Sequence, residues 1–281
     1  MSALKVITGF LVGADPTKLK DTQLHVCLSD VFVALDLNFR SKAMALAEND
    51  PENKDKKAWG LVGSHHGGLG YDFSNLGAAC KHVQQYLTSL KSGGSLEENL
   101  LLAAEIEHFM FSVRGALDSA TIIFTRLIEL NPTGEKRLWR IDSFNDLLTR
   151  LETLQQEGKC AEVTKSFFPL LNHKGWFTEL RDVRDRITHN AGQPIVFNDK
   201  GEIYFGVFLG QRSLPVTGAR QMGDKNIYPV RETLRFFKDK TIEAFNDMGK
   251  LLVVLYEPAF KGKVPCRSAF ESLLMPYIHG I

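Results

Sequence analysis

The residues best suited to chemistry lie together in one short segment, residues 180–190, which read LRDVRDRITHN. The segment contains Arg184, Asp185 and His189. If it is helical, Asp185 and His189 are one turn apart and can touch. A carboxylate beside an imidazole fixes the tautomer of the ring and raises its basicity. A neighbouring arginine can hold a phosphate through two parallel hydrogen bonds.

This combination of side chains is what metal-free RNA cleavage requires. A base removes the proton of the 2′-hydroxyl, and a cation stabilises the charge on the phosphorane oxygens. The same residue types also fit a solvated helix face with ordinary Asp–Arg pairs and a histidine near the negative end of the helix dipole. Residue types alone leave both interpretations open.

A helix over about residues 175–189 would position this segment. Its apolar residues recur at steps of four, three and four and would bury one face: Trp176, Leu180, Val183 and Ile187. Measured around the helix from Leu180, Arg184 falls at about 40° and His189 at about 180°. We therefore expect the ionisable residues to occupy one flank and His189 to point away from the core of its own bundle.

Basic residues near this segment suggest how RNA could be attracted to it. Arg181, Arg186 and Lys174 could give a local positive potential, although a solvated, charged helix end explains them equally well. The whole chain has 34 basic and 33 acidic residues, a formal net charge of +1. That balance excludes a protein that relies on a global basic field to hold nucleic acid.

The strongest helical pattern lies over about residues 96–130. Ser95 and Glu98 form a capping box before it, and an apolar stripe then recurs at helical spacing. Such a long amphipathic helix is typical of the spine of a helical bundle. Arg114 and Asp118 lie four apart on its polar flank, where they can form an ion pair or assist a site.

The remaining pattern is also mostly helical. We expect helices over about residues 24–47, 74–90, 143–156 and 230–256, and a short helix or turn within 161–171. Alternating apolar residues around an Asn-Asp-Lys-Gly turn predict a β-hairpin over residues 195–209. Five glycines predict a loop over residues 60–70, and residues 210–223 read as another loop.

These elements predict a mainly α fold, a helical bundle with one inserted β-hairpin. At 281 residues the chain is long enough for one large domain or two modest ones. We expect residues 1–95 to form an N-terminal helical elaboration packed on the bundle. Residues 96–281 would form the bundle itself, with the hairpin near residues 195–209.

Two parts of the chain resemble the HEPN superfamily (higher eukaryotes and prokaryotes nucleotide-binding). The run Arg184-Asp185-x-x-x-His189, at the end of a bundle helix, resembles the signature motif of that superfamily. The pattern Glu107-His108-Phe109 followed by Arg114-x-x-Leu117-Asp118 is similar to the long core helix of its prokaryotic members. The resemblance covers about residues 97–257.

The resemblance implies a function and a set of partners. HEPN proteins are helical bundles that often dimerise so that two motifs face one cleft. Many are metal-independent endoribonucleases of toxin–antitoxin, abortive-infection or other antiviral systems, whereas others have lost catalysis and bind a nucleotide, RNA or a protein. The implied partners are RNA, a second copy of the chain, and an antitoxin or other protein; no cofactor or metal is implied.

The resemblance also assigns roles to individual residues. Arg184 and His189 would be the catalytic pair, with Asp185 as the polar residue that orients them. The supporting residues would be Arg114, Asp118 and Asn190. The RNA-binding residues proposed from their charge, and not from the resemblance, are Arg181, Arg186 and Lys174.

A different chemistry is conceivable at His65-His66. Adjacent histidines can bind a metal if further ligands converge on them, which would make the chain a metallohydrolase. Alternatively they decorate a glycine-rich loop. The four cysteines, Cys27, Cys80, Cys160 and Cys266, have no zinc or redox spacing and are expected to be free thiols in a reducing compartment.

Several other functional classes lack support. The chain has no P-loop, no dinucleotide-binding Gly-x-Gly-x-x-Gly before a helix, no zincin His-Glu-x-x-His and no Gly-x-Ser-x-Gly. The longest apolar run, residues 251–256, is far shorter than the ~20 residues of a membrane span. The apolar stretch after Lys5 is short, interrupted by glycine and followed by charges, unlike a signal peptide. We therefore expect a cytoplasmic protein without membrane contact.

Overall fold

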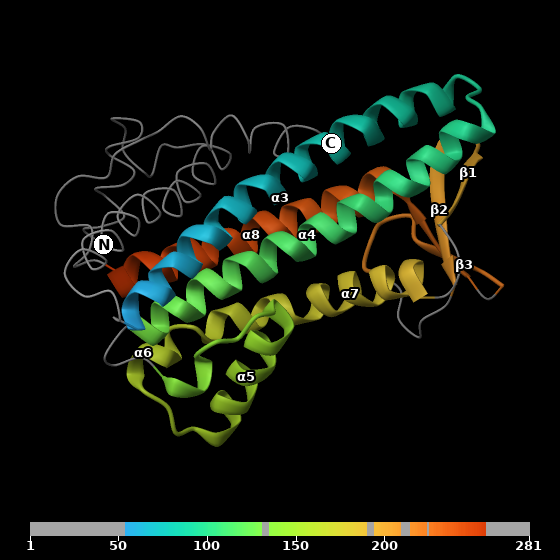
Figure 1. Cartoon of the computed structure of the whole chain (residues 1–281). Coiled ribbons are helices and arrows are strands. Elements are labelled where there is room, and N and C mark those ends of the chain that lie inside the picture. Colours follow the sequence, from blue (N-terminus) through green and yellow to red (C-terminus); the bar gives the residue numbers. More distant parts are fainter. Residues whose placement is uncertain (1–53, 131–134, 190–193, 209–213, 224, 257–281) are drawn as a thin grey trace, which may run out of the picture. The chain divides into compact units, whose positions relative to one another are not determined.

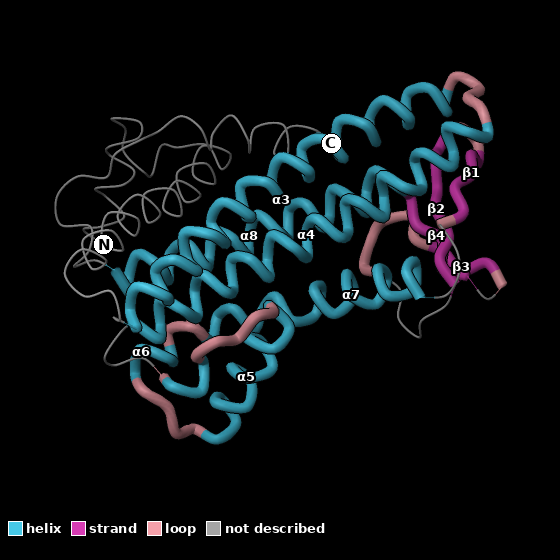
Figure 2. Tube along the Cα trace, in the orientation of Figure 1, coloured by secondary structure: helices cyan, strands magenta, loops and turns pink. Residues whose placement is uncertain are grey.

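The computed structural model describes residues 54–130, 135–189, 194–208, 214–223 and 225–256. This part of the chain is mainly helical and carries one small antiparallel sheet (Figures 1 and 2). The predicted mainly α class is confirmed at this level. The helix expected over residues 24–47, together with Cys27 and Cys266, lies outside the described residues.

The helices have the following bounds. The α-helices are α3 (Lys54–Lys91), α4 (Leu96–Leu130), α5 (Phe144–Glu157), α6 (Glu162–Lys165), α7 (Lys174–His189) and α8 (Val230–Tyr256). Two 3₁₀ helices, η2 (Lys136–Leu138) and η3 (Phe168–His173), lie between them. The ranges predicted for α4, α5, α7 and α8 agree with these bounds to within one or two residues.

The chain divides into two compact units, each built from segments distant in sequence. Among the described residues, unit 1 comprises those within 54–71, 116–174 and 242–256, and unit 2 comprises those within 72–115 and 175–241. Helices α3, α4 and α8 therefore each contribute to both units. The predicted division at residue 95 falls in the turn between α3 and α4, inside unit 2.

The prediction of a loop over residues 60–70 was wrong, because α3 runs through this stretch as one helix. The expected helix start near residue 74 was wrong for the same reason, whereas its end near residue 90 is confirmed at Lys91. Each glycine inside a helix costs about 1 kcal/mol relative to alanine. Burial of side chains such as Leu69, which is fully buried, offsets that cost. Tertiary packing thus overrides local propensity here.

The predicted capping box between α3 and α4 is confirmed. The backbone N–H of Ser95 donates to Oε2 of Glu98 at 2.7 Å, and the N–H of Glu98 donates to the hydroxyl of Ser95 at 3.2 Å. The hydroxyl of Ser89 donates to Oε1 of the same carboxylate. These hydrogen bonds hold the pKa of Glu98 below its ordinary range, and the bond from Ser89 has the largest effect. The carboxylate thus joins the end of α3 to the start of α4.

The sheet has four strands instead of the predicted two. They are β1 (Ile195–Asp199), β2 (Glu202–Phe208), β3 (Arg220–Met222) and β4 (Lys225–Pro229), all antiparallel in the order β1-β2-β4-β3. The hairpin of β1 and β2 is confirmed, with Gly201 at φ +84° in its turn. The loop predicted over residues 210–223 was wrong at β3, whose residues are all exposed and show no apolar alternation.

Two side chains of unit 1 anchor the start of α5. Its start is capped by Ser143, whose side chain accepts from the backbone N–H of Asp146 at 3.1 Å. A second anchor comes from α4, where Oδ1 of Asp118 accepts from the N–H of Phe144 at 2.8 Å. Helix α5 buries its apolar face at Phe144, Leu147, Leu148, Leu151 and Leu154.

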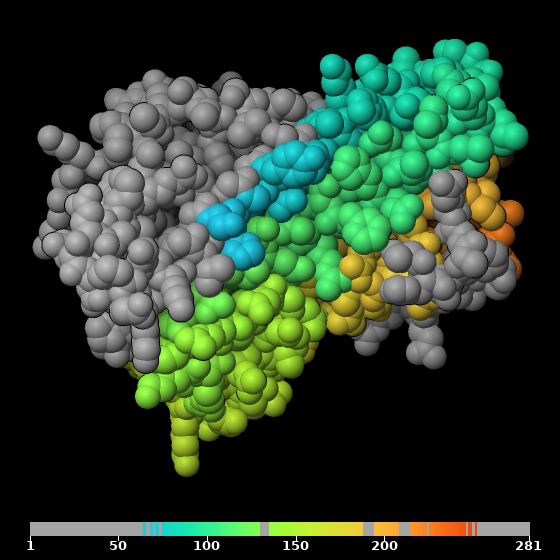
Figure 3. Space-filling model, viewed as in Figure 1, coloured from blue at the N-terminus to red at the C-terminus, as the bar shows by residue number. Residues whose placement is uncertain are grey.

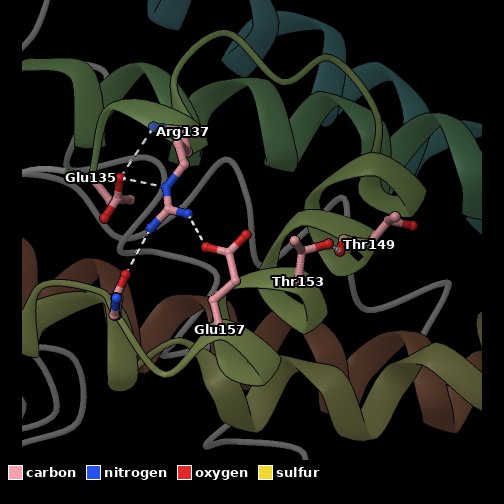
Figure 4. A network of polar contacts seen from close by, with 6 residues as sticks. Glu135, Arg137, Thr149, Thr153 and Glu157 are labelled. Atoms are coloured by element: carbon pink, nitrogen blue, oxygen red, sulfur yellow. Dashed lines mark hydrogen bonds and ion pairs between the residues drawn. The ribbon is translucent and has the colours of Figure 1, made fainter.

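A polar network, the Arg137 clamp, ties η2 to the end of α5 (Figure 4). Nε of Arg137 donates to Glu135 at 3.1 Å, Nη2 donates to the carbonyl of Lys159 at 2.8 Å, and Nη1 pairs with Glu157. The hydrogen bonds to Glu135 and Glu157 raise the pKa of Arg137, the bond to Glu135 most. Every nitrogen of this guanidinium therefore serves the fold.

Candidate functional site

Helix α7 presents the predicted motif on a well-packed scaffold. The residues expected to face the core are all buried: Trp176, Leu180, Val183 and Ile187. Their burial fixes the rotation of the helix, so the polar residues between them occupy the other flank. The helical prediction and its apolar face are confirmed.

Arg184 is held between two helices of unit 2. Its guanidinium carbon lies 5.5 Å from the centre of the Phe111 ring on α4, within the range of a cation–π contact. Its Nη2 also pairs with the carboxylate of Asp185. The side chain of Arg184 is 16% exposed and that of Asp185 is 40% exposed. The stacking and the ion pair together fix where the positive charge sits.

His189 is the last residue of α7, one turn after Asp185. It lies five positions after Arg184, which corresponds to about 7.5 Å along the helix axis. The side chain of His189 and the whole of Asn190 lie outside the described residues. The expectation that His189 points away from its own core therefore stays a prediction.

The three basic residues expected to attract RNA have different surroundings. Lys174 pairs with Glu152 of α5 in unit 1. Arg181 pairs with the adjacent Asp182 at 3.4 Å. Arg186 lies near Tyr228 of β4. Burial is the main cause that raises the pKa of Tyr228, and the positive charge of Arg186 acts against it. Each basic residue is thus engaged with its own neighbours.

The two residues of α4 with expected supporting roles belong to different units. Asp118 anchors the start of α5 in unit 1 through its bond to the backbone of Phe144. That contact gives Asp118 a structural role that explains its position without chemistry. Arg114 is half-buried in the part of α4 that belongs to unit 2.

His65 belongs to helix α3, where a loop was expected. Burial is the main cause that lowers its pKa; Asp142 acts against this shift and Arg126 adds to it. The side chain of His66 lies outside the described residues. Among the side chains that the structure does describe, no group of three or more His, Cys, Asp or Glu is arranged to hold a metal ion.

A second cluster of chemically capable side chains lies in unit 2 and was missed by sequence reasoning. Nδ1 of His82 on α3 lies 2.8 Å from Oε1 of Glu105 on α4. Nδ1 of His108 lies 3.6 Å from Oε2 of the same carboxylate. The spacing Glu105-x-x-His108 could have indicated half of this cluster, because residues three apart share a helix face. His82, 23 residues earlier, is brought in by the pairing of α3 and α4.

Comparisons with protein-family models, with curated protein sequences and with solved structures find no match to this chain. No helix within the described ranges combines the length and apolar character needed to cross a membrane. Function therefore has to be inferred from the geometry of the chain's own residues.

Proposed function

We propose that this protein is a metal-independent endoribonuclease of the HEPN type, with Arg184 and His189 as its catalytic pair. The observation that carries the proposal is the placement of Arg184. The side chain is stacked on Phe111 and paired with Asp185, which precedes His189 by one helical turn. A cation held in place needs little reorganisation when negative charge develops on a phosphate.

The proposed reaction uses each member of the motif. His189 accepts the proton of a 2′-hydroxyl, and the 2′-oxygen attacks the adjacent phosphorus. Arg184 stabilises the charge on the phosphorane oxygens, and Asp185 orients the two side chains. The bond between phosphorus and the 5′-oxygen breaks, that oxygen takes up a proton from water, and the products are a 2′,3′-cyclic phosphate and a 5′-hydroxyl; His189 then returns its proton to the solvent. We expect single-stranded or looped RNA as the substrate, because the 2′-oxygen must align with the leaving oxygen.

The proposal includes a homodimer whose interface or cleft contains α7. In full solvent, water would weaken the charges that must act on the phosphorane. A second copy across a two-fold axis would exclude water and double the positive charge. Exposed apolar residues on α4 would contribute to such an interface: Leu96, Leu100 and Phe111, the last of which contacts Arg184 of α7. Light scattering at micromolar concentration should give a dimer, and a monomer would contradict this part of the proposal.

The proposed activity is tested by incubating the protein with tRNA and mRNA in EDTA, beside a His189→Ala variant. We expect the original chain to cleave the RNA and to leave 2′,3′-cyclic phosphate ends. The rate of the variant should be lower by a factor of about 10² or more. Equal cleavage by both proteins, or none by either at high concentration, would overturn it. A role in antiviral or toxin–antitoxin defence, with an antitoxin as partner, belongs to the same proposal.

A second candidate function is a HEPN module that binds nucleotide, RNA or a protein without catalysis. It is favoured by the state of Arg184, whose charge is already balanced by Asp185 and whose side chain is largely covered. This candidate predicts binding of RNA by gel shift without any change in the RNA ends. Product end-group determination separates the two functions, because only the nuclease creates cyclic phosphates.

A further inference from the structure

The four-stranded sheet of unit 2 has two faces of different character. Residues directly opposite each other on neighbouring antiparallel strands point to the same face, so the register of the strands assigns each side chain to a face. One face belongs to the core, with Ile203, Phe205 and Tyr228 buried. The other, the outer face, includes side chains that are half-buried or exposed: Ile195, Phe197, Tyr204, Arg220 and Met222. Atoms of the strands, coloured amber to orange, reach the surface at the right-hand edge of the space-filling view (Figure 3).

Three planar groups form a row across the outer face, and we call Phe197, Tyr204 and Arg220 the aromatic platform. Phe197 on β1 and Tyr204 on β2 are directly opposite each other, and their rings stack with centroids 5.8 Å apart and planes 18° apart. The guanidinium carbon of Arg220 lies 4.5 Å from the centre of the Tyr204 ring, within the range of a cation–π contact. Arg220 starts on β3, so its side chain crosses β4 to reach β2 (Figure 2).

The charged side chains around the platform are accessible to a ligand. Nη2 of Arg220 donates to Oδ2 of Asp199 at 2.6 Å, and the two side chains are 41% and 36% exposed. Oε2 of Glu202, the other described carboxylate of this face, lies 4.0 Å from Nζ of Lys91. Lys200 adds an exposed positive charge in the turn between β1 and β2. Because an exposed ion pair contributes little to stability, a phosphate oxygen can take the place of the Asp199 carboxylate on Arg220.

A single-stranded RNA fits this combination of groups better than an apolar protein surface does. A protein that covered the outer face would have to remove Arg220, Asp199 and Lys200 from water, which costs free energy unless the protein supplies a partner for each of them. An RNA strand brings planar bases for the rings and its own phosphates for the cations. Four-stranded sheets that carry aromatic rings are a recurring support for unstacked RNA bases.

We propose that the outer face of the sheet binds single-stranded RNA, with a base stacked against the rings of Phe197 and Tyr204 and a phosphate bound by Arg220. The inference rests on the proposed function, because it takes RNA as the ligand, and it assigns no step of the cleavage to the sheet. His189 at the end of α7 and Ile195 at the start of β1 are six positions apart, so at most about 22 Å separates them. RNA held on the platform can therefore extend to the α7 motif.

The main experiment measures the Kd of a fluorescein-labelled oligouridine of about twelve nucleotides by fluorescence anisotropy in EDTA. The protein is the full-length His189→Ala chain, which keeps the RNA intact during the measurement. Phe197→Leu and Tyr204→Leu, each added to this chain, keep an apolar side chain in the strand and remove a ring. Each should raise Kd about tenfold, because a base loses its stacking partner. Kd values within about twofold of the parent for both variants would overturn the inference.

Conservative variants separate stacking from a structural role of the rings. Phe197→Tyr and Tyr204→Phe restore a ring and should bind within about twofold of the parent chain. Phe236→Leu changes a half-buried aromatic residue of α8 in the same unit and is the matched control, with an unchanged Kd. Thermal melts check that each variant is folded, and an isoleucine variant, which favours strands, replaces a leucine variant that is not. Loss of affinity in the conservative variants as well would contradict stacking.

Arg220 is tested through the salt dependence of binding. Arg220→Ala should raise Kd about fivefold and reduce the number of phosphate contacts, given by the salt slope, by about one. Arg220→Lys should restore the slope and only part of the affinity, because it keeps the charge and loses the planar fork. Arg235→Ala, at an exposed position of α8, is the control. An unchanged slope in Arg220→Ala would show that Arg220 binds no phosphate and would overturn its role.

A duplex RNA of the same length separates stacking from attraction by charge alone. Its bases are already stacked on one another and cannot stack on the platform, so it should bind at least about tenfold more weakly than the single strand. Equal affinity for the two would overturn the inference. Loss of a dimer in Phe197→Leu by light scattering, with an unchanged Kd for RNA, would assign the outer face to a second copy and would also overturn it.

Failure of this inference is distinguishable from failure of the proposed function. If the unchanged protein cleaves RNA in EDTA while the leucine variants bind as tightly as their parent, the proposed function stands and the inference is wrong. If the leucine variants bind weakly and the unchanged protein does not cleave, the inference stands and the module that binds without catalysis is favoured. If the protein neither binds nor cleaves RNA, both are overturned.

Discussion

The described part of each unit contains a histidine hydrogen-bonded to a carboxylate, and these two pairs differ mainly in exposure. In unit 2, His82 pairs with Glu105 at 2.8 Å and is 46% exposed. In unit 1, His173 pairs with Asp247 at 3.0 Å and is 5% exposed. The buried pair links the end of η3 to α8, so it serves the fold. The exposed pair leaves one side of its imidazole accessible, so it is available for chemistry.

Two arginines repeat the same contrast. Arg137 distributes its three nitrogens over Glu135, Glu157 and the carbonyl of Lys159, and it thereby joins η2 to α5 (Figure 4). Arg184 pairs with the next residue on its own helix, and that ion pair joins no separate elements. Bonds between elements distant in the chain are those expected to matter for stability, whereas a charge paired along its own helix can be redirected to a ligand.

The largest expected effect on stability is the difference between the two histidines. His173→Ala should lower the free energy of unfolding by about 2–3 kcal/mol, because it removes a buried side chain and leaves Asp247 without this partner. His82→Ala should change it by no more than about 0.5 kcal/mol, because exposed pairs contribute little. Urea denaturation of both variants measures the difference. Equal losses in the free energy of unfolding would show that the difference in exposure does not change what each pair contributes to stability.

A slightly smaller effect is expected at Arg184, on rate instead of stability. Arg184→Ala should slow RNA cleavage about 30-fold, which corresponds to about 2 kcal/mol of transition-state stabilisation. Loss of the contact with Phe111 should cost about 0.5–1 kcal/mol of stability. Arg184→Lys should recover part of the rate, because it keeps the charge and loses the planar fork. Arg150→Ala, on the exposed side of α5, is the control, and similar slowing there would remove the special role of Arg184.

Variants of Asp118 test whether this polar residue of α4 has a structural role only. Asp118→Ala should destabilise the protein by about 1 kcal/mol, because the N–H of Phe144 loses its acceptor at the start of α5. Asp118→Asn keeps an acceptor oxygen and should recover most of that loss. Cleavage per folded molecule should be unchanged in both variants. A lower rate without a change in thermal midpoint would instead support the catalytic assistance expected from the HEPN resemblance.

The smallest expected effect is on thermal stability, and it concerns the hydrogen bonds of Glu98 with Ser89 and Ser95 between α3 and α4. The pKa of Glu98 lies below its ordinary range, mainly through the hydroxyl of Ser89. A carboxyl with a lowered folded-state pKa stabilises the fold above its unfolded pKa, and this contribution disappears as the pH falls through the folded value.

Ser89→Ala should therefore lower Tm at neutral pH, by about 2 °C or less, and the gap should close as the pH falls from neutral into the acid range. Thermal melts of both proteins across this pH range measure it. Glu97→Ala, which removes the neighbouring exposed carboxylate, provides the control for a general effect of charge. A gap that stays constant with pH would mean that Ser89 acts without Glu98.

The features that could be predicted from the sequence are those determined within a few residues. The box of Ser95 and Glu98, the cap at Ser143 and the turn of the β1–β2 hairpin each depend on groups three residues apart. The apolar face of α7 follows the helical period in the same way. For such features the local backbone geometry already brings the partners together, so spacing and residue type suffice.

The candidate site shows where local information ends. Spacing correctly placed Arg184 and Asp185 on the polar flank of α7, yet it gave no indication that Arg184 stacks on Phe111, 73 positions earlier. The pairing of His82 with Glu105 likewise depends on α3 and α4 packing against each other. A long-range contact forms only when buried area elsewhere has already positioned both helices.

The sequence by itself determined the mainly helical class, the principal helix ends, the first hairpin and the motif of α7, because propensity, capping and apolar period act locally. Only the tertiary structure decided that residues 60–70 are helical, that β3 and β4 complete a sheet, and which histidine–carboxylate pair is buried. In each case the free energy of packing distant segments exceeds the local preference of about 1 kcal/mol per residue. Exposure, which separates His82 from His173, is a property of the folded chain as a whole.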